Sequence, residues 1–165
     1  MIDFGEIALR LGIATVAGLL LGLDREMRGL PAGLRTHGLV ALSSAAITVS
    51  ALQMYAQLGS EADIDPLRVT QGLAQAIGFI AAGIIFASRG TVRNVTTAAN
   101  LWLASAIGIA AGAAQFDIAG IALALGFLLL VVVGEIERRL LPPAPPEGKD
   151  GERTAAGRDD ARPPP

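Results

Sequence analysis

Five apolar stretches, separated by short polar segments, dominate the pattern along this chain. They cover residues 4–23, 38–58, 69–87, 97–114 and 118–136. Each approaches the ~20 residues that a helix needs to cross the hydrocarbon core of a bilayer. The pattern predicts an all-α, polytopic membrane protein with about five transmembrane helices, which together form one domain over residues 1–141.

The first stretch also suits the apolar region of a signal peptide, because its uninterrupted core covers only residues 11–23. Its flanks argue against that interpretation. Asp3 and Glu6 stand where a signal peptide carries positive charge, and charged residues follow where a cleavage site needs small ones. Glu6 and Arg10 are spaced i, i+4, so we expect them to form an ion pair that lets the helix begin near Phe4.

Arginines follow every second apolar stretch. They are Arg25, Arg28 and Arg35 after the first, Arg89 and Arg93 after the third, and Arg138 and Arg139 after the fifth. Loops rich in arginine remain in the cytoplasm. The distribution therefore predicts an N-terminus outside and a C-terminus in the cytoplasm.

Residues 142–165 differ sharply in composition from the rest of the chain, because proline and charged residues replace the large apolar ones. Such a segment cannot bury enough surface to fold. We expect a disordered, proline-rich cytoplasmic tail, with a weak binding role as the alternative.

Composition excludes several classes of function. Hydrophobic residues make up 52% of the chain and charged residues only 17%, whereas about a quarter of a soluble domain is charged. Cysteine is absent and His37 is the single histidine, which excludes thiolate and multi-histidine metal sites. No nucleophile and base pair can be assembled, so we expect no enzymatic activity. A net charge of -2 gives no indication of nucleic-acid binding.

A faint internal repeat relates the first two spans to the third and fourth. Residues 17–20 resemble residues 82–85, and after a short offset Thr36, Leu42 and Ser44 match Thr97, Leu103 and Ser105. Two hairpins would then share one plan about an axis along the membrane normal, as in some transporters. The abundance of Ala, Gly and Leu in both segments is the alternative explanation.

Small residues predict close helix packing at two places. Gly18 and Gly22 form a GxxxG motif in the first span, and Gly108 and Gly112 form another in the fourth. Such motifs let helix backbones approach closely. They indicate either a homodimer interface or packing within one bundle.

Three amide side chains lie inside predicted spans: Asn100 in the fourth, and Gln71 and Gln75 in the third. A polar group in hydrocarbon needs a partner, so we expect hydrogen bonds between helices. Lining of an ion path is the alternative for these residues.

Polar residues also gather at the predicted cytoplasmic ends of the spans. Asp24 and Glu26 offer the oxygen ligands that Mg²⁺ prefers, whereas the arginines suit a phosphate group. Thr36 and Thr96 open the second and fourth spans, where side-chain oxygens cap helices and the helix dipole attracts anions. Two such ends facing one another would form a polar vestibule. The alternative is that the carboxylates pair with arginines and fix the loops at the lipid headgroups.

Four motifs carry a resemblance to a known family. They are GLDRE at residues 22–26, AGLRTHGLV at residues 32–40, GII at residues 83–85 and TTAANLW at residues 96–102. Over about residues 7–136 the chain resembles the membrane domain of the MgtC/SapB family. The resemblance implies a multi-pass protein of the bacterial inner membrane that is associated with magnesium or general ion homeostasis. Two functions stay open, a small ion (Mg²⁺) transporter and a regulatory protein that binds and modulates another membrane complex.

The chain also departs from the MgtC pattern within this resemblance. Leu103 stands where cysteine follows the tryptophan in MgtC, Asn94 replaces a usual glycine, and the proline-rich tail stands in place of a soluble domain. These differences favour the broader SapB-like group.

By position, the family pattern points to Asp24 or Glu26, Arg35, Thr36, Thr96, Thr97 and Trp102. The complete set of candidate site residues is Asp24, Arg25, Glu26, Arg35, Thr36, His37, Arg93, Thr96, Thr97, Asn100 and Trp102. Asp24 and Glu26 are the candidate Mg²⁺ ligands, and no cofactor is expected apart from Mg²⁺ as ligand or substrate. Replacement of Arg35 or Thr36 is expected to abolish function. The expected partners are the lipid bilayer, a second copy of the chain and another membrane protein.

Overall fold

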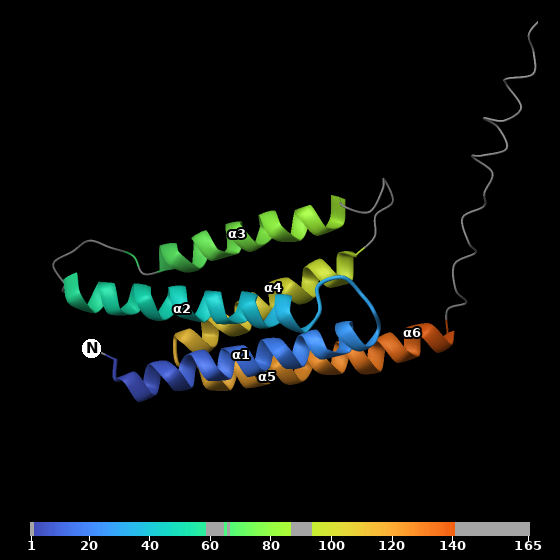
Figure 1. Ribbon diagram of the computed structural model, residues 1–165, viewed down its shortest axis with the longest axis horizontal. Helices are drawn as coiled ribbons and strands as arrows, with labels where there is room; N and C mark the ends of the chain where they lie inside the picture. Colours follow the sequence, from blue (N-terminus) through green and yellow to red (C-terminus); the bar gives the residue numbers. More distant parts are fainter. Residues whose placement is uncertain (1, 59–64, 66, 87–93, 141–165) are drawn as a thin grey trace, which may run out of the picture. The chain divides into compact units, whose positions relative to one another are not determined.

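The computed structural model describes residues 2–58, 65, 67–86 and 94–140, and this part of the chain is helical and contains no strand (Figure 1). The elements are α1 (Phe4–Met27), α2 (Leu34–Leu58), α3 (Leu67–Phe86), α4 (Val95–Gly112), α5 (Phe116–Leu128), a π-helical segment η1 (Leu129–Val133) and α6 (Gly134–Leu140). Five helical stretches among these residues are long and apolar enough to cross a membrane, the last of them being Phe116–Glu137. The predicted all-α membrane fold is confirmed. Arg89, Arg93 and the predicted tail at residues 142–165 lie outside the described residues.

Charged side chains at both ends determine the length of α1. The Asp3 carboxylate accepts a hydrogen bond from the Gly5 amide at 3.1 Å and caps the first turn. Glu6 and Arg10 form the predicted ion pair. At the other end α1 continues to Met27, beyond the predicted limit at residue 23, because the i, i+4 pair of Asp24 and Arg28, at 2.7 Å, stabilises the last turn.

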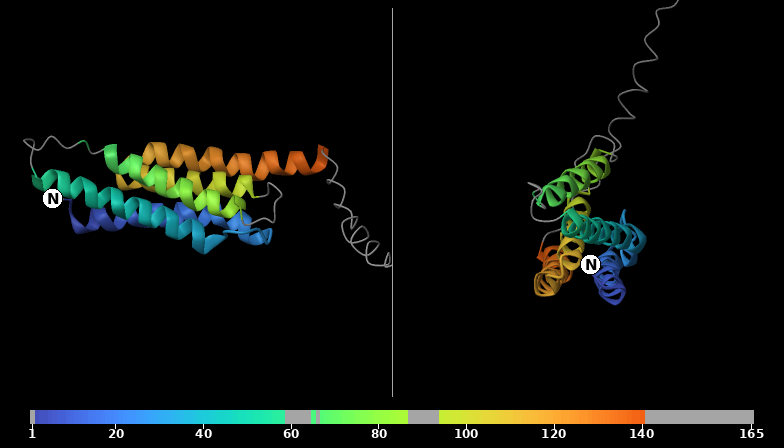
Figure 2. Two further views of the ribbon diagram at one scale, coloured as in Figure 1. Left: turned by 90° about the horizontal axis from the view of Figure 1, so that it is seen from above. Right: turned by 90° about the vertical axis from the view of Figure 1, so that its left-hand side faces the viewer.

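Helix α4 lies at the centre of the bundle formed by α1 to α5, and it contacts α1, α2, α3 and α5 (Figure 2). In its span 61% of the residues are buried, against 17% for α3, which packs mainly on α4. Helix α3 is therefore an edge helix with most of its surface uncovered.

Glycines bring the backbones of α1, α2 and α4 into contact. A Cβ added at Gly18 would lie 2.6 Å from the His37 carbonyl oxygen, and one at Gly108 would lie 2.3 Å from the Ala41 carbonyl oxygen. A Cβ added at Gly112 would lie 2.7 Å from the Ala45 carbonyl oxygen. Both GxxxG motifs therefore serve packing within one bundle. They leave no room there for a second copy.

Helices α2 and α4 run in the same direction, since Ala41 faces Gly108 and Ala45 faces Gly112. On the same interface the hydroxyls of Ser44 and Ser105 form a buried hydrogen bond of 2.9 Å. These serines are equivalent in the predicted repeat. A direct contact between equivalent residues is the geometry expected beside an axis that relates two hairpins.

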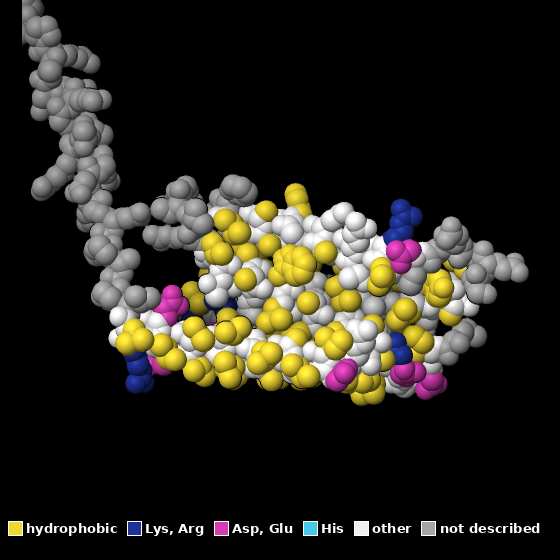
Figure 3. Space-filling view, turned by 180° about the vertical axis from the view of Figure 1, so that it is seen from behind, with side chains coloured by type: hydrophobic (Ala, Val, Ile, Leu, Met, Phe, Trp, Pro, Cys, Tyr) yellow, Lys and Arg dark blue, Asp and Glu magenta, His cyan; other side chains and the backbone are white. Residues whose placement is uncertain are grey.

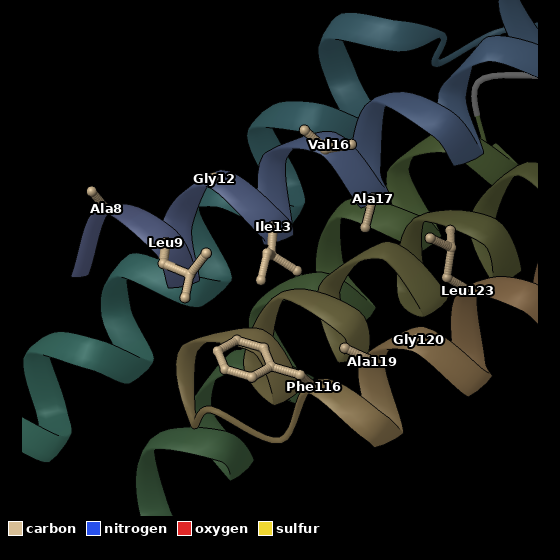
Figure 4. Close-up of a pocket in the computed structure, with 10 residues that line it drawn as sticks. All are labelled: Ala8, Leu9, Gly12, Ile13, Val16, Ala17, Phe116, Ala119, Gly120 and Leu123. Carbon is tan, nitrogen blue, oxygen red and sulfur yellow. The ribbon is translucent and has the colours of Figure 1, made fainter. Parts of the chain in front are cut away.

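The outer surface is largely apolar, as a lipid-facing surface must be. One face carries hydrophobic side chains along its length, whereas charged side chains gather toward its ends (Figure 3). Between α1 and α5 lies an apolar groove of about 540 Å³ (Figure 4). Its lining consists of Ala8, Leu9, Gly12, Ile13, Val16, Ala17, Phe116, Ala119, Gly120 and Leu123. Lipid acyl chains can fill such a groove, because its apolar lining needs no polar partner.

Candidate functional site

The last turns of α1 meet the first turns of α2 and α4 at one end of the bundle. Helices α1 and α4 run in opposite directions, because the Asn100 amide nitrogen donates to the Leu21 carbonyl at 3.4 Å while Arg10 Nη1 donates to the Gly112 carbonyl at 2.9 Å. This register places Thr97 at the level of Arg25, one turn beyond Leu21. Gly22 packs on the backbone of residues 33–34, where α2 begins.

Four polar side chains from these three helices are buried at this end, and we call them the polar cluster. The exposed fractions are 6% for Arg25, 0% for His37, 0% for Thr97 and 4% for Asn100. The guanidinium of Arg25 lies within electrostatic range of the imidazole of His37. Each member has one buried polar atom with no hydrogen-bond partner among the described residues: Arg25 Nε, His37 Nε2, Thr97 Oγ1 and Asn100 Oδ1.

The hydrogen bonds that do form assign donors and acceptors within the polar cluster. His37 Nδ1 lies 3.0 Å from the Gly33 carbonyl oxygen, which only accepts, so Nδ1 carries a proton and Nε2 of the neutral ring is an acceptor. The Asn100 amide nitrogen donates to the Leu21 carbonyl, and Oδ1 remains available as an acceptor. Arg25 Nε is a hydrogen-bond donor, and the Thr97 hydroxyl can both donate and accept. Water, which both donates and accepts, matches this mixture of donors and acceptors, and the positive charge of Arg25 disfavours a cation.

The two candidate Mg²⁺ ligands lie outside the polar cluster and have partners of their own. The Asp24 carboxylate is paired with Arg28, and Glu26 Oε2 accepts a hydrogen bond from the Leu34 amide at 3.2 Å. Residues spaced i, i+2 do not face each other on a helix. No group of three His, Asp or Glu side chains in the described ranges could hold a metal ion. Magnesium ligation by Asp24 and Glu26 stays a prediction that these contacts do not favour.

The predicted helix caps are wrong. Helix α2 begins at Leu34, so Thr36 is its third residue, and the carboxylate of Glu26 from the preceding helix serves its first amide. Helix α4 begins at Val95 with Asn94 at the cap position, so Thr96 lies within the first turn. For α2, a tertiary contact that the local sequence does not reveal serves the first amide of the helix.

The remaining candidates lie apart from the polar cluster. Arg35 and Thr96 are exposed and Thr36 is half-buried. Trp102 is 46% exposed and lines two grooves beside α3 and α4. Arg93 lies outside the described residues. The structure thus gathers Arg25, His37, Thr97 and Asn100 from the predicted set.

Comparison with known proteins agrees with this architecture. The sequence model of the MgtC family matches residues 11–139. The chain is 32% identical over 138 residues to a protein of Escherichia coli (strain K12) named "Putative magnesium transporter YhiD", a match that covers 82% of this chain and 64% of YhiD. It is 37% identical to SapB of Bacillus subtilis (strain 168), over 66% of this chain and 48% of SapB.

A third relative is MgtC of Brucella abortus (strain 2308), which is 39% identical over 109 residues, or 66% of this chain and 43% of that protein. The chain thus spans between about two fifths and two thirds of the length of these relatives. No solved structure matches it. The family match extends over most of the sequence and includes, at least in part, each of the five described helical stretches that could cross a membrane. The chain therefore belongs to the MgtC family, and it is a multi-pass membrane protein.

Proposed function

We propose that this chain is a component of magnesium homeostasis in the bacterial inner membrane that acts by binding another membrane protein and does not itself conduct Mg²⁺. The link to magnesium is supported by membership of the MgtC family and by the name of the Escherichia coli relative. The regulatory mode is supported by one observation on the described helices. Their buried charges are all positive.

Arg10 and Arg25 are the buried charged side chains of the described residues, and they lie toward opposite ends of α1. No carboxylate is buried in the same part of the chain. Arg25 forms no ion pair with a described carboxylate; the adjacent Asp24, whose charge offsets part of that of Arg25, is paired with Arg28. At a separation of about 5 Å and an effective dielectric constant of about 20, one guanidinium repels a divalent cation by about 7 kcal/mol.

The space between the two arginines is filled mainly with apolar side chains. Leu21, Leu101 and Ile107 are at most 1% exposed. Mg²⁺ gives up its hydration water reluctantly and needs oxygen ligands in exchange. A path between these helices offers the positive charge of Arg25 at one end and mainly apolar side chains in the middle, which supports a role without conduction; Arg10 at the other end is paired with Glu6.

Transport of Mg²⁺ is the second candidate, and the name of YhiD favours it. The experiment that separates the two is Mg²⁺ entry into liposomes that contain the purified protein and an internal indicator, under an imposed gradient and potential. We expect entry at the rate of protein-free vesicles, with helicity measured by circular dichroism to confirm folding. Saturable entry that is lost when Asp24→Asn and Glu26→Gln are combined would establish transport and overturn the proposal.

The positive test uses a bacterial strain that lacks its own MgtC family gene and grows poorly in low magnesium. The wild-type chain should restore growth. Adjacent threonines provide a matched pair of variants, because Thr97 is buried in the polar cluster whereas Thr96 is exposed. Thr97→Val should abolish restoration and Thr96→Val should retain it, at equal amounts in the membrane.

The stability of the Thr97→Val variant distinguishes a functional role of Thr97 from a structural one. The valine replaces a buried hydroxyl that has no partner in the described structure, so Thr97→Val should be as stable as the wild type or more stable. Failure of the wild-type chain to restore growth would remove the link to magnesium. Equal growth of the two variants would remove the polar cluster from the mechanism.

A further inference from the structure

We propose that the chain forms a homodimer through α3, with Gln71 and Gln75 hydrogen-bonded to the same residues of a second copy. The contact surface, which we call the α3 face, consists of Gln71, Gly72, Gln75, Ala76, Phe79 and Gly83. All six residues are exposed. At 100° per residue they fall within one side of the helix.

The amides of Gln71 and Gln75 are the reason that this surface requires a polar partner. The candidate span on α3 is Leu67–Ile85, and Gln75 lies next to its midpoint. At 1.5 Å per residue it stands ~12 Å from the start of the helix, too deep for a glutamine side chain to reach the interface. Neither amide is hydrogen-bonded to any described residue, which contradicts the expected bonds within the bundle. In hydrocarbon an unsatisfied amide is costly, so Gln75 needs a partner from outside the described residues.

A second copy meets this requirement without further assumptions. A carboxamide both donates and accepts, so it is complementary to itself. A twofold axis along the membrane normal places equivalent residues at the same depth, and Gln75 then faces Gln75 of the other copy. A different protein would need its own hydrogen-bonding groups at the same two depths.

The rest of the α3 face suits close contact between helices. Nothing lies within 4 Å of a Cβ added at Gly72 or Gly83, so a second helix could approach α3 closely at these glycines. Phe79, which is 83% exposed, stands between the two glycines along the helix and can pack across them. Helix α3 is the least covered of the first four spans, with 17% of its span buried, and Figure 2 shows it at the edge of the bundle. The groove between α1 and α5 differs, because it carries no polar group that hydrocarbon leaves unsatisfied.

The test is disulfide cross-linking in native membranes, for which the absence of cysteine from the chain is convenient. Ala76→Cys and Phe79→Cys place single thiols on the α3 face. Ile121→Cys on α5, at a position that is 62% exposed, is the matched control. We expect a product of twice the chain mass from the first two variants and none from the third.

A second measurement tests the amides themselves. Combining Gln71→Leu with Gln75→Leu should weaken dimerisation about tenfold in a fluorescence energy-transfer titration in bilayers, given the size of hydrogen bonds between membrane helices. Gln75→Asn, which keeps an amide, should retain most of the affinity. Because both glutamines are exposed, the monomer should keep its helicity.

Three outcomes would overturn the proposal. Equal cross-linking at Ile121→Cys would indicate random collision, and a product of a different mass would mean that another protein occupies the α3 face. Unchanged affinity after removal of both amides would exclude them as the contact. None of these measurements depends on Mg²⁺ or on growth, so their failure is distinguishable from failure of the proposed function.

Discussion

Replacing Gly108 by alanine should destabilise the bundle by forcing α2 and α4 apart. The added Cβ would lie 2.3 Å from the Ala41 carbonyl oxygen and 3.0 Å from two further backbone atoms of Ala41, whereas ordinary contact begins at 3.4 Å. No side chain can rotate out of the way, because all three atoms belong to the backbone. The helices must therefore separate by about 1 Å at this point.

Three contributions determine the size of the effect, and one of them opposes the other two. Overpacking a close contact costs about 1–3 kcal/mol. Alanine is favoured over glycine within a helix by about 1 kcal/mol, which offsets part of that cost. Separation also strains the buried hydrogen bond between Ser44 and Ser105, which lies on the same interface. We expect a net loss of about 2 kcal/mol in the free energy of unfolding.

The assay is reversible unfolding in mixed micelles, followed by circular dichroism, with Gly120→Ala as the matched control. Gly120 lies within α5, and nothing lies within 4 Å of a Cβ added there. Only the gain in helix propensity remains, so Gly120→Ala should be neutral or more stable by up to about 1 kcal/mol. If Gly108→Ala unfolded at the same denaturant concentration as Gly120→Ala, the close packing of α2 on α4 would be refuted.

Three further predictions concern the ends of the helices. Arg10→Met removes the guanidinium that donates to the Gly112 carbonyl at the end of α4, so it should lower the free energy of unfolding by about 2 kcal/mol in the same assay. Glu26→Ala removes the acceptor of the Leu34 amide and should cost about 1 kcal/mol, while Glu26→Gln, which keeps an acceptor, should cost less. A reporter that is active only in the cytoplasm should work when fused after Arg139, and activity of a periplasmic reporter at that position would reverse the predicted topology.

Hydropathy alone predicts the number and type of the helices, because a bilayer allows few other ways to satisfy the backbone. It does not predict their ends. Helix α1 extends to Met27 because Asp24 and Arg28 pair along it, and α2 starts at Leu34, before the apolar run begins, because Glu26 serves its first amide. Charged residues that hydropathy assigns to loops thus belong to helices.

The candidate site is only partly predictable for a related reason. Asn100 has the expected partner on another helix, the Leu21 carbonyl, whereas Gln71 and Gln75 have none in the described structure. All three amides look alike in sequence, and only the neighbours of each helix distinguish them. Arg25 did carry a usable signal, since it lies seven residues after Gly18 and therefore on the same face of α1 as the glycines that pack. That spacing predicts burial, which a count of loop charges does not.

The two halves of the predicted repeat are similar in sequence but pack differently. Gly18 on α1 and Gly83 on α3 occupy matching positions in similar sequences, but Gly18 is pressed against the His37 carbonyl and Gly83 is open. The inner helices α2 and α4 keep the symmetry of the repeat, because the equivalent residues Ser44 and Ser105 contact each other directly. The outer helices α1 and α3 do not, since α1 also packs closely on α4 whereas α3 makes few contacts with α2. A face that packs inside the bundle in the first hairpin is therefore left on the surface in the second. A second copy placed against α3 would give that face the contacts that α1 finds within its own chain.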